Sequence, residues 1–302
     1  MLNLPDSNLQ ELVAGVYKIR RLHKGDVVSV QILSNARSGD CTQNCAYCAQ
    51  SHVSEANISK YRITDYEPLL KTGQIAKENG LARHCIGLSG IRFTDEEVNE
   101  FADMVTELKS DVGLPICCSI GFLTEAQARK LKAAGVDRIN HNLNTGRNNY
   151  PNICTTHKYD ERLNNIKMLQ SIGFEICCGG IIGLGESADD IVDMLFDIRT
   201  INPQAVPINF LLPVKGTPLE NASTEHLTPE YCLKILCLAR LLMPKSDIRC
   251  TAGREVYLKG RDKELFSIVD SIFASGYLTE GGQGIDDTIS SIKNAGFEYI
   301  LE

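Results

Sequence analysis

The chain has 302 residues and a hydrophobic content of 43%, enough for a sizeable core in one large domain or two ordinary ones. Its net charge of −7 at pH 7, without a block of Lys and Arg, argues against nucleic acid or an anionic membrane as a partner. No apolar run reaches the roughly 18 residues that span a bilayer, and the first residues do not read as a signal peptide. We therefore expect the twelve cysteines to be reduced thiols in the cytoplasm.

Predicted strands and helices alternate along the chain. A helical segment of mixed charge lies within residues 1–25, before the first β-branched stretch. Capping boxes at Thr94 and Thr124 predict two of the later helix starts. The expected strands are residues 27–33, 83–87, 114–120, 136–143, 174–182, 205–212, 247–252 and 271–273. The expected helices are residues 66–79, 94–110, 124–135, 158–172, 187–200, 228–243, 263–268 and 286–295.

This alternation predicts an α/β fold with a parallel sheet and helices outside it. Eight strand–helix units in a chain of this length favour a closed (β/α)8 TIM-type barrel, and an open doubly wound sheet is the alternative. We expect one domain over residues 1–302, with a C-terminal extension at 275–302. In such barrels the active site lies at the carboxyl ends of the strands, so the residues there carry the functional prediction.

Three cysteines follow the first predicted strand within eight residues: Cys41, Cys45 and Cys48. Three thiolates on one loop can hold three irons of a cubane iron–sulfur cluster, which leaves the fourth iron open to a small molecule. The alternative is a structural zinc site, for which His52 is near enough in sequence to be the fourth ligand.

Further cysteines lie on the predicted strands, where barrel interiors usually carry Val, Ile and Leu. A lone strand cysteine is most often a packing residue, but several on neighbouring strands predict a second metal or cluster site inside the barrel. These are Cys85, Cys117, Cys118, Cys177, Cys178 and Cys250. Strand alternation directs Cys118, Cys178 and Cys250 away from their neighbours, and His141 outward as a structural residue. Cys154, Cys232 and Cys237 read as ordinary buried thiols.

The triplet, with Tyr47 before its last cysteine, resembles the Cys-x3-Cys-x-aromatic-Cys signature of the radical S-adenosylmethionine (SAM) superfamily. Over about residues 25–280 the chain further resembles the biotin synthase family of that superfamily. The stretches that carry this resemblance are residues 45–51, 140–143, 155–162, 179–186, 206–209, 215–219 and 252–255.

The resemblance implies two clusters and a bound SAM molecule. Cys41, Cys45 and Cys48 would hold a [4Fe–4S] cluster. The residues implied in SAM binding are Tyr47, Asn142, Asn144, Arg162 and Gly183. The auxiliary cluster would be held by Cys85, Cys117, Cys177 and Arg249. It is usually a [2Fe–2S] cluster, and a four-iron cluster is the alternative if Cys250 replaces Arg249 as the fourth ligand.

The activity implied by the resemblance is sulfur insertion into dethiobiotin to give biotin, with the auxiliary cluster as sulfur donor. Asn142 and Asn209 would bind the ureido group of dethiobiotin. A small electron donor such as flavodoxin or ferredoxin and a homodimeric assembly are also expected. The alternatives are another radical SAM enzyme of similar build, such as a hydrogenase maturase or methylornithine synthase, and a non-catalytic iron–sulfur or zinc protein.

Overall fold

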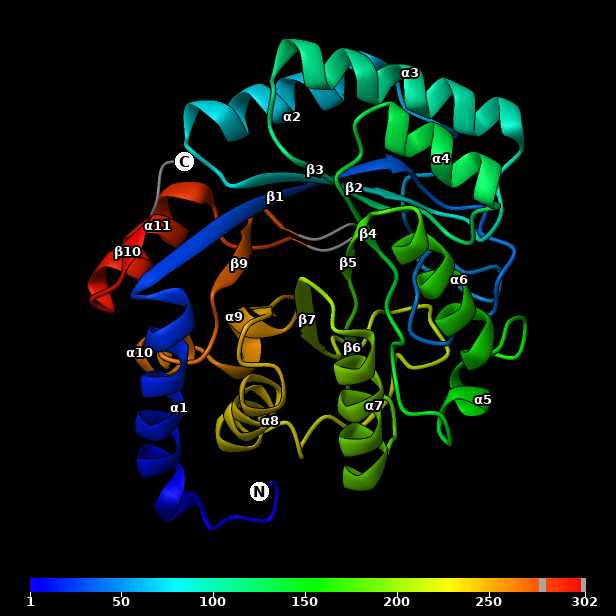
Figure 1. Ribbon diagram of the computed structural model, residues 1–302. Helices are drawn as coiled ribbons and strands as arrows, with labels where there is room; N and C mark the ends of the chain where they lie inside the picture. Colours follow the sequence, from blue (N-terminus) through cyan, green and yellow to red (C-terminus); the bar gives the residue numbers. More distant parts are fainter. Residues whose placement is uncertain (277–280, 300–302) are drawn as a thin grey trace.

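The computed structural model describes residues 1–276 and 281–299, and Figure 1 shows a ring of strands with helices outside it. Strand β1 pairs with both β2 and β9, which closes the sheet, and every strand pairing is parallel. The predicted (β/α)8 barrel is therefore confirmed. Its strands are β1 (Val27–Arg37), β2 (Arg83–Leu88), β3 (Ile116–Ser119), β4 (Arg138–Asn140), β5 (Glu175–Cys177), β6 (Gly180–Ile182), β7 (Ala205–Phe210), β8 (Asp247–Cys250) and β9 (Ser271–Ala274).

The fifth predicted strand, residues 174–182, is divided into β5 and β6 at Cys178 and Gly179. Opposite this break lies Pro207 of β7, which has no N–H group to donate to the ladder. A Cβ atom on Gly179 would lie 1.8 Å from the carbonyl oxygen of Pro207, so the close approach requires glycine. The break between β5 and β6 therefore has a cause on each side: Gly179 at the break itself and Pro207 on β7.

Helices cover the outside of the sheet, and most of them begin where the sequence predicts. The capping boxes at Thr94 and Thr124 are present, and Thr228 caps the helix that Pro229 begins. The helices are η1 (Asp6–Asn8), α1 (Leu9–Lys24), α2 (Tyr66–Glu78), α3 (Asp95–Asp111), α4 (Glu125–Ala133), α6 (Tyr159–Ser171), α7 (Ala188–Ile201), α8 (Pro229–Leu242), α10 (Asp262–Phe266) and α11 (Ile285–Asn294).

Three short elements are absent from the sequence prediction: α5 (Tyr150–Ile153), α9 (Arg254–Tyr257) and β10 (Glu298–Tyr299). Each is at most one helical turn or two residues long, which is too short to produce a hydrophobic period. Residues 277–280 and 300–302 of the predicted C-terminal extension lie outside the described residues. The rest of that extension contains α11 and β10, and β10 pairs with the start of β1.

Strand alternation divides the buried cysteines between two layers. Cys85, Cys117 and Cys177 face the barrel interior and pack with Phe273 and Leu33. The core between the sheet and the helices contains the cysteines that follow Cys117, Cys177 and Arg249, together with two cysteines of α8. These are Cys118, Cys178, Cys250, Cys232 and Cys237.

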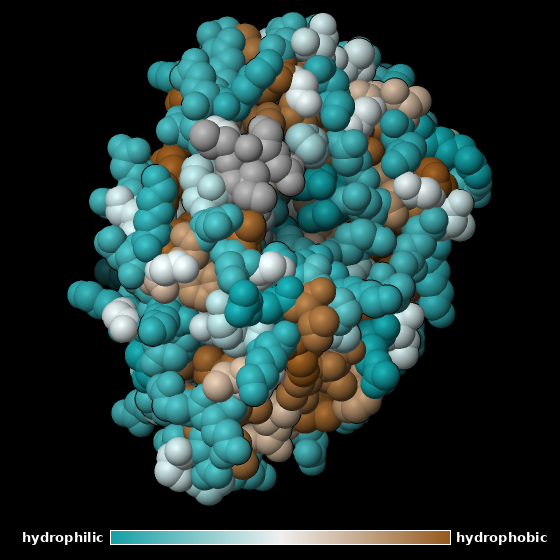
Figure 2. Space-filling model, turned by 60° about the vertical axis from the view of Figure 1, so that its left-hand side comes forward, coloured by the Kyte–Doolittle hydropathy of each residue, from teal (hydrophilic) through white to brown (hydrophobic). Residues whose placement is uncertain are grey.

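The face shown in Figure 2 is largely hydrophilic, with hydrophobic residues gathered in its lower part. Within residues 1–276 and 281–299, no helix is long and apolar enough to cross a membrane.

Candidate active site

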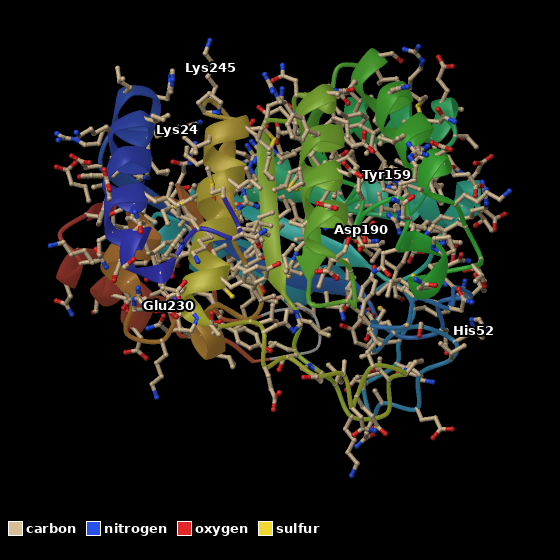
Figure 3. All side chains as sticks on the ribbon, turned by 90° about the horizontal axis from the view of Figure 1, so that it is seen from below. Lys24, His52, Tyr159, Asp190, Glu230 and Lys245 are labelled. Atoms are coloured by element: carbon tan, nitrogen blue, oxygen red, sulfur yellow. The ribbon has the colours of Figure 1, made fainter. Side chains whose placement is uncertain are left out.

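A cavity of about 400 Å³ opens at the end of the barrel where the strands finish. Figure 3 shows this end of the molecule: His52 and Glu230 lie there, opposite Lys24 and Lys245, which precede β1 and β8. Thiols from the loop after β1 and thiols from the strands line this one cavity: Cys41, Cys45, Cys48, Cys85 and Cys117. The two predicted groups of cysteines are thus brought together at different depths of one space.

The triplet loop is folded by its own backbone hydrogen bonds. The N–H of Cys48 donates to the carbonyl of Cys45 (3.1 Å), and the N–H of Cys41 donates to the carbonyl of Gln50 (3.3 Å). These turns direct all three thiols toward the cavity. Burial raises the pKa of Cys48 to about 11, which favours the neutral thiol, and a bound cation would favour the thiolate. Three converging soft ligands fit an iron–sulfur cluster.

His52, the alternative zinc ligand, is exposed and does not line this cavity. It lies in a second cavity on the outer side of the loop, which Cys41 and Gln50 also line. The structure therefore does not bring His52 to the side where the three thiols converge.

Arg162 of α6 lines the cavity beside the triplet. Its Nε donates to the Tyr150 hydroxyl (2.6 Å), its Nη1 to the Asn142 carbonyl (3.1 Å) and its Nη2 to His157 Nε2 (2.8 Å). Three of the five guanidinium N–H groups are used by these described partners, which leaves two for an anionic ligand. No carboxylate of the described residues pairs with Arg162, so it is not the exposed salt-bridge residue of an ordinary helix.

The other residues implied in SAM binding surround the same space. Tyr47, Asn142 and Asn144 line the cavity, whereas Gly183 lies just outside it in the turn after β6. Asn144 has a left-handed backbone (φ 72°), and its carbonyl accepts the N–H of Ile181 (2.7 Å). Gly183 also has a positive φ of 102°, which favours glycine.

Asn142, in the segment after β4, and Asn209 of β7 line the cavity, but part of each amide is hydrogen-bonded to the backbone. Asn142 Oδ1 accepts the N–H of Gly179 (3.0 Å), beside the break between β5 and β6. Asn209 Nδ2 donates to the Gly180 carbonyl (3.1 Å), and its Oδ1 accepts the Thr251 hydroxyl (2.5 Å). Each amide is thereby held in a defined orientation.

The structure corrects the orientation that the sequence predicts for His141. Alternation placed it outward, but it is buried (3% exposed) and lines the cavity with its neighbours. Strand β4 ends at Asn140, so the alternation of a strand no longer governs the next residue. His141 Nε2 has no hydrogen-bond partner among the described residues.

Below the triplet, three strand cysteines meet in the barrel interior. Cys85 and Cys117 are register partners on β2 and β3, and Cys177 follows on β5. The hydrogen bond with Cys177 lowers the pKa of Cys117, but the bond with Cys85 and burial outweigh it and raise that pKa to about 12. The hydrogen bond with Cys117 lowers the pKa of Cys85. The three thiols therefore lie close enough for each to influence the pKa of a neighbour.

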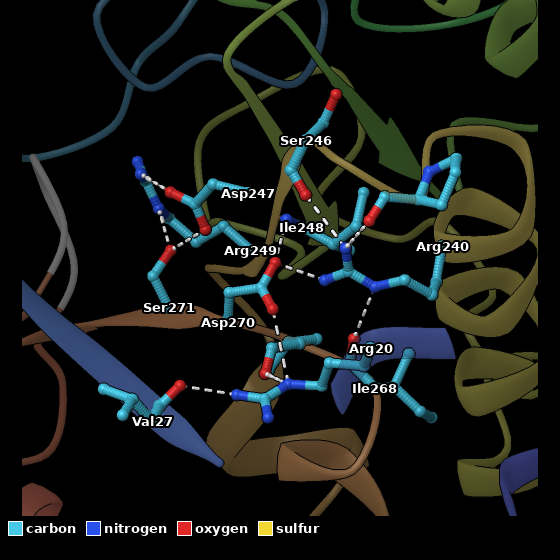
Figure 4. Close-up of polar contacts among 12 residues, drawn as sticks. Arg20, Val27, Arg240, Ser246, Asp247, Ile248, Arg249, Ile268, Asp270 and Ser271 are labelled. Carbon is cyan, nitrogen blue, oxygen red and sulfur yellow. Dashed lines mark hydrogen bonds and ion pairs between the residues drawn. The ribbon is translucent and has the colours of Figure 1, made fainter. Parts of the chain in front are cut away.

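Arg249 of β8 is 1% exposed and lies beside these thiols. Burial disfavours its charge, but the Asp247 carboxylate and the nearby cysteines raise its pKa overall. Its Nε donates to Ser271 Oγ (2.8 Å), and its Nη2 pairs with Asp247 (2.7 Å), as Figure 4 shows. Ser271 Oγ also donates to Asp247 (2.6 Å). Asp247 and Ser271 thus form a polar cradle that holds the guanidinium of Arg249. No described residue forms a hydrogen bond with Nη1 of Arg249, so this nitrogen is available to a ligand.

A second buried ion cluster lies beneath this cradle. Asp270 accepts a hydrogen bond from Arg240 and lies 3.3 Å from Nε of Arg20 (Figure 4). Both arginines are fully buried and also donate to backbone carbonyls. These contacts tie α1 and α8 to the segment just before β9 and to the start of β8, and so support the strand that carries Arg249.

Cys250 lies on the opposite face of β8 from Arg249. It is fully buried in the layer between sheet and helices, and burial raises its pKa to about 12. Of the described residues on this strand, Arg249 lines the cavity and Cys250 does not. The structure therefore does not bring Cys250 to the other three cysteines.

The sequence reading missed Cys154, which was assigned only to packing. Its Sγ lies 3.8 Å from Cys45 Sγ and 3.2 Å from His157 Nδ1. With the Cys45 thiol as donor, this hydrogen bond lowers the pKa of Cys154 and raises that of Cys45. A Cys45 thiolate bound to a metal would have no proton to donate and would accept instead. The Cys-x2-His spacing of residues 154–157 was a signal that could have directed attention to this pair.

Two family models match consecutive parts of the chain. The Radical SAM superfamily model matches residues 37–198, and the Biotin and Thiamin Synthesis associated domain matches residues 207–298. Solved structures of similar shape include methylornithine synthase (TM-score 0.83, 22% identity, 97% of this chain and 90% of that one). Another is the FeFe-hydrogenase maturase HydG from Carboxydothermus hydrogenoformans (TM-score 0.84, 17% identity, 97% and 72%). At these identities the likeness concerns the fold alone.

Curated relatives match at much higher identity and over nearly the whole chain. Biotin synthase from Geobacillus kaustophilus is 39% identical over 99% of this chain and 89% of its own length. Biotin synthase from Bacillus subtilis strain 168 is 39% identical (99% and 88%), and that from Rhodopirellula baltica is 38% identical (99% and 82%). The triplet, the interior cysteines and these full-length matches together show that the chain belongs to the biotin synthase family of radical SAM enzymes.

Proposed function

We propose that this chain forms biotin from dethiobiotin, with one cluster at the mouth of the cavity and a second cluster at its inner end. The observation that carries this proposal is that the three loop thiols and two of the interior thiols, Cys85 and Cys117, line the same space of about 400 Å³. Cys177 packs beside those two. A substrate held between them is close to both groups at once. A metal carrier would have no need for such a shared cavity.

Cys41, Cys45 and Cys48 would hold the [4Fe–4S] cluster at the mouth of the cavity. When bound, this cluster and SAM supply a carbon radical that removes hydrogen from unactivated C–H bonds, and the auxiliary cluster supplies the sulfur. The residues of the chain provide ligands, orientation and shelter from water. Three converging thiols without His52 support a cluster over the zinc alternative.

Arg162 would bind the carboxylate of SAM through the two N–H groups that its described partners leave free. Tyr47 would flank the adenine, and Asn142 and Asn144 would bind the ribose at the end of β4. The positive φ of Gly183 keeps the turn after β6 free of a side chain, which would let the backbone approach the adenosine.

Cys85, Cys117, Cys177 and Arg249 would hold the auxiliary cluster, which we propose to be [2Fe–2S]. This ligand set is supported by Nη1 of Arg249, to which no described residue is hydrogen-bonded, and by the packing of the three interior thiols in one cluster. The position of Cys250 on the helix side of β8 argues against a four-iron cluster that uses its thiol. To bind iron through Nη1, Arg249 would have to give up a proton there, because a protonated guanidinium only donates.

Asn142 and Asn209 would bind the ureido group of dethiobiotin between the two clusters. An amide offers a donor and an acceptor, as a cyclic urea requires. Their existing contacts hold each amide in place. Asn142 keeps its N–H groups and one lone pair for a ligand, whereas Asn209 Oδ1 already accepts from Thr251 and Ala252 and leaves one N–H group to donate.

Further features of the family resemblance concern the whole molecule. We propose one barrel domain, because the regions 37–198 and 207–298 contribute strands to the same closed sheet. A flavodoxin or ferredoxin would deliver electrons, and Cys41 offers a route because it lines both the inner and the outer cavity. Twelve free thiols support a cytoplasmic location, and the resemblance alone supports a homodimer.

The test is anaerobic reconstitution with iron and sulfide, followed by incubation with SAM, a reductant and dethiobiotin. The expected result is two clusters per chain and the formation of biotin together with methionine and 5′-deoxyadenosine. SAM cleavage without biotin, from protein with both clusters, would contradict the proposed substrate. Binding of zinc without sulfide would contradict both cluster assignments.

A further inference from the structure

The thiol of Cys154 lies against the triplet although 109 positions separate it from Cys45 in sequence. It is 5% exposed, follows α5, and its Sγ is 3.8 Å from Cys45 Sγ. The proposed function gives Cys154 no role. A buried thiol in contact with a proposed cluster ligand nevertheless alters the surroundings of that ligand.

Backbone contacts on both sides of Cys154 fix this distance. The N–H of Ala46 donates to the carbonyl of Ile153 (2.9 Å), and the N–H of Thr155 donates to Asn44 Oδ1 (3.0 Å). The residues before and after Cys154 are thus hydrogen-bonded to the residues before and after Cys45. The contact between the two sulfurs follows from how the two segments dock.

A mononuclear metal site is the first interpretation to consider. The ligand atoms of Cys45, Cys154 and His157 all lie within 4.8 Å of one another. Two thiolates on one tetrahedral Zn²⁺ would lie about 3.8 Å apart, given a Zn–S bond of about 2.3 Å. The spacing of the sulfurs alone is therefore compatible with zinc.

The protonation of His157 argues against that interpretation. Arg162 Nη2 lies 2.8 Å from His157 Nε2, and because a guanidinium only donates, Nε2 accepts. The proton of the neutral imidazole is then on Nδ1, which donates to Gln43 Oε1 (2.9 Å) and faces Cys154 Sγ. The imidazole offers the thiols an N–H group and no lone pair, so the three side chains form a hydrogen-bonded chain.

The hydrogen of the Cys154 thiol has few acceptors. Asn44 Oδ1 lies 3.3 Å from the sulfur but already accepts from the N–H of Thr155 and from the N–H and hydroxyl of Thr156. Thr156 Oγ1 is also 3.3 Å away, but it is a neutral oxygen. A thiolate that binds iron carries negative charge and is the stronger acceptor.

We propose that Cys154 is a positioning residue that donates an S–H hydrogen bond to the Cys45 sulfur and raises the reduction potential of the cluster at the triplet. The inference rests on the proposed role of Cys45 as a cluster ligand. Hydrogen bonds to ligand sulfurs stabilise the more negative, reduced form of an iron–sulfur cluster. Through His157, the same chain connects this thiol to Arg162, the proposed SAM-binding residue.

The experiment is a redox titration of the anaerobic, reconstituted full chain, followed by electron paramagnetic resonance. The reduced signal that changes when SAM is added identifies the cluster at the triplet. Cys154→Ala is expected to shift its midpoint potential to a more negative value, whereas Cys154→Ser, which keeps a donor, stays near the wild type. Cys237→Ala removes another fully buried thiol, from α8, and is expected to leave the potential unchanged.

An unchanged potential in Cys154→Ala, with iron and sulfide equal to the wild type, would overturn the inference. An equal shift in Cys154→Ala and Cys154→Ser would also overturn it, because packing would then be the cause. If Cys154→Ala loses iron, Cys154→Val fills the space without a donor and allows the same comparison. Failure of the proposed function is distinguishable from failure of this inference. A wild type without a SAM-responsive signal lacks the cluster at the triplet, and a wild type with that signal but without biotin formation contradicts only the substrate.

Discussion

The two groups of thiols differ in how the fold assembles them. Cys41, Cys45 and Cys48 lie within eight residues, on one loop that folds through its own turns and its contacts with residues 153–157. Cys85, Cys117 and Cys177 come from three strands and meet only because the closed sheet brings these strands together. Cys85 and Cys117 are register partners, whereas Cys177 lies on β5, beyond β4. The first group is a local motif on the mouth of the barrel, whereas the second is a product of the whole barrel.

The two groups also differ in charge. Beside the interior thiols, the fixed cation Arg249 is balanced by Asp247, and Arg138 is balanced by Glu175 (2.7 Å). The triplet has Arg162 beside it, whose described partners are neutral. The interior site thus resembles a preformed and neutralised ligand set, while the triplet region keeps a cation available for an anionic ligand. Each of the following predictions tests this contrast.

The largest effect is expected from Cys45→Ala, which removes a ligand from the triplet only. SAM cleavage should fall to background and iron content by about four atoms per chain, while the interior cluster is retained. Iron analysis and chromatography of 5′-deoxyadenosine measure the two quantities. Retention of both clusters in this variant would mean that Cys45 is not a ligand.

Cys177→Ser and Cys178→Ser form a matched pair at adjacent positions. Cys177 faces the barrel interior and Cys178 the helices, so only the first variant should lose the interior cluster and biotin formation. Both should keep the cluster at the triplet and cleave SAM. Assays of biotin, together with sulfide content, measure the contrast. Equal losses in the two variants would show that strand orientation does not decide the ligand.

Asp247→Asn tests the cradle that holds Arg249. The substitution keeps the size of the side chain but removes the charge that pairs with Nη2 of Arg249 and accepts the Ser271 hydroxyl. Loss of an orienting partner of this kind weakens metal binding about 10–100-fold. The rate of iron release to a chelator measures this change. Asp286→Asn, an exposed carboxylate of α11, is the control, and equal rates would contradict the prediction.

The smallest expected effect is a loss of folding stability at low pH, which arises at His84 on the strand that carries Cys85. Burial lowers the pKa of His84 to about 4, below the unfolded value of about 6.5. Between these values the unfolded chain binds more protons than the folded one, so stability is complete above about pH 6.5 and declines as pH falls toward 4. The expected loss is about 3 kcal/mol.

Chemical denaturation of the cluster-free protein at several pH values measures this decline. His84→Gln keeps a partner for Ser34, which lies 2.7 Å from the ring, but cannot titrate, so its stability should depend less on pH in this range. An identical decline in the variant would assign the pH dependence to other groups.

Most of the fold could be predicted from the sequence because most of its helices and strands are long and regular. The caps at Thr94, Thr124 and Thr228 mark helix starts through local hydrogen bonds, and these were confirmed. The break at Cys178 and Gly179 was not predicted, because its cause, Pro207, lies on another strand. The outward orientation predicted for His141 was wrong for a related reason: side chains alternate only as far as the strand extends, and β4 ends at Asn140.

The sequence by itself determined the alternation of strands and helices that favours a (β/α)8 barrel, the triplet and the residue types of the site, because these depend on periods and spacings within short stretches. The pairing of β1 with β9, which closes the sheet, came from the structure. Only the tertiary structure decided that the interior thiols share a layer, that Cys250 faces the helices and that Cys154 touches Cys45. Such contacts depend on strand register and on the docking of distant segments. The physical reason is that a hydrogen bond or sulfur contact acts over a few ångströms in space, and no spacing along one chain encodes which distant residues come that near.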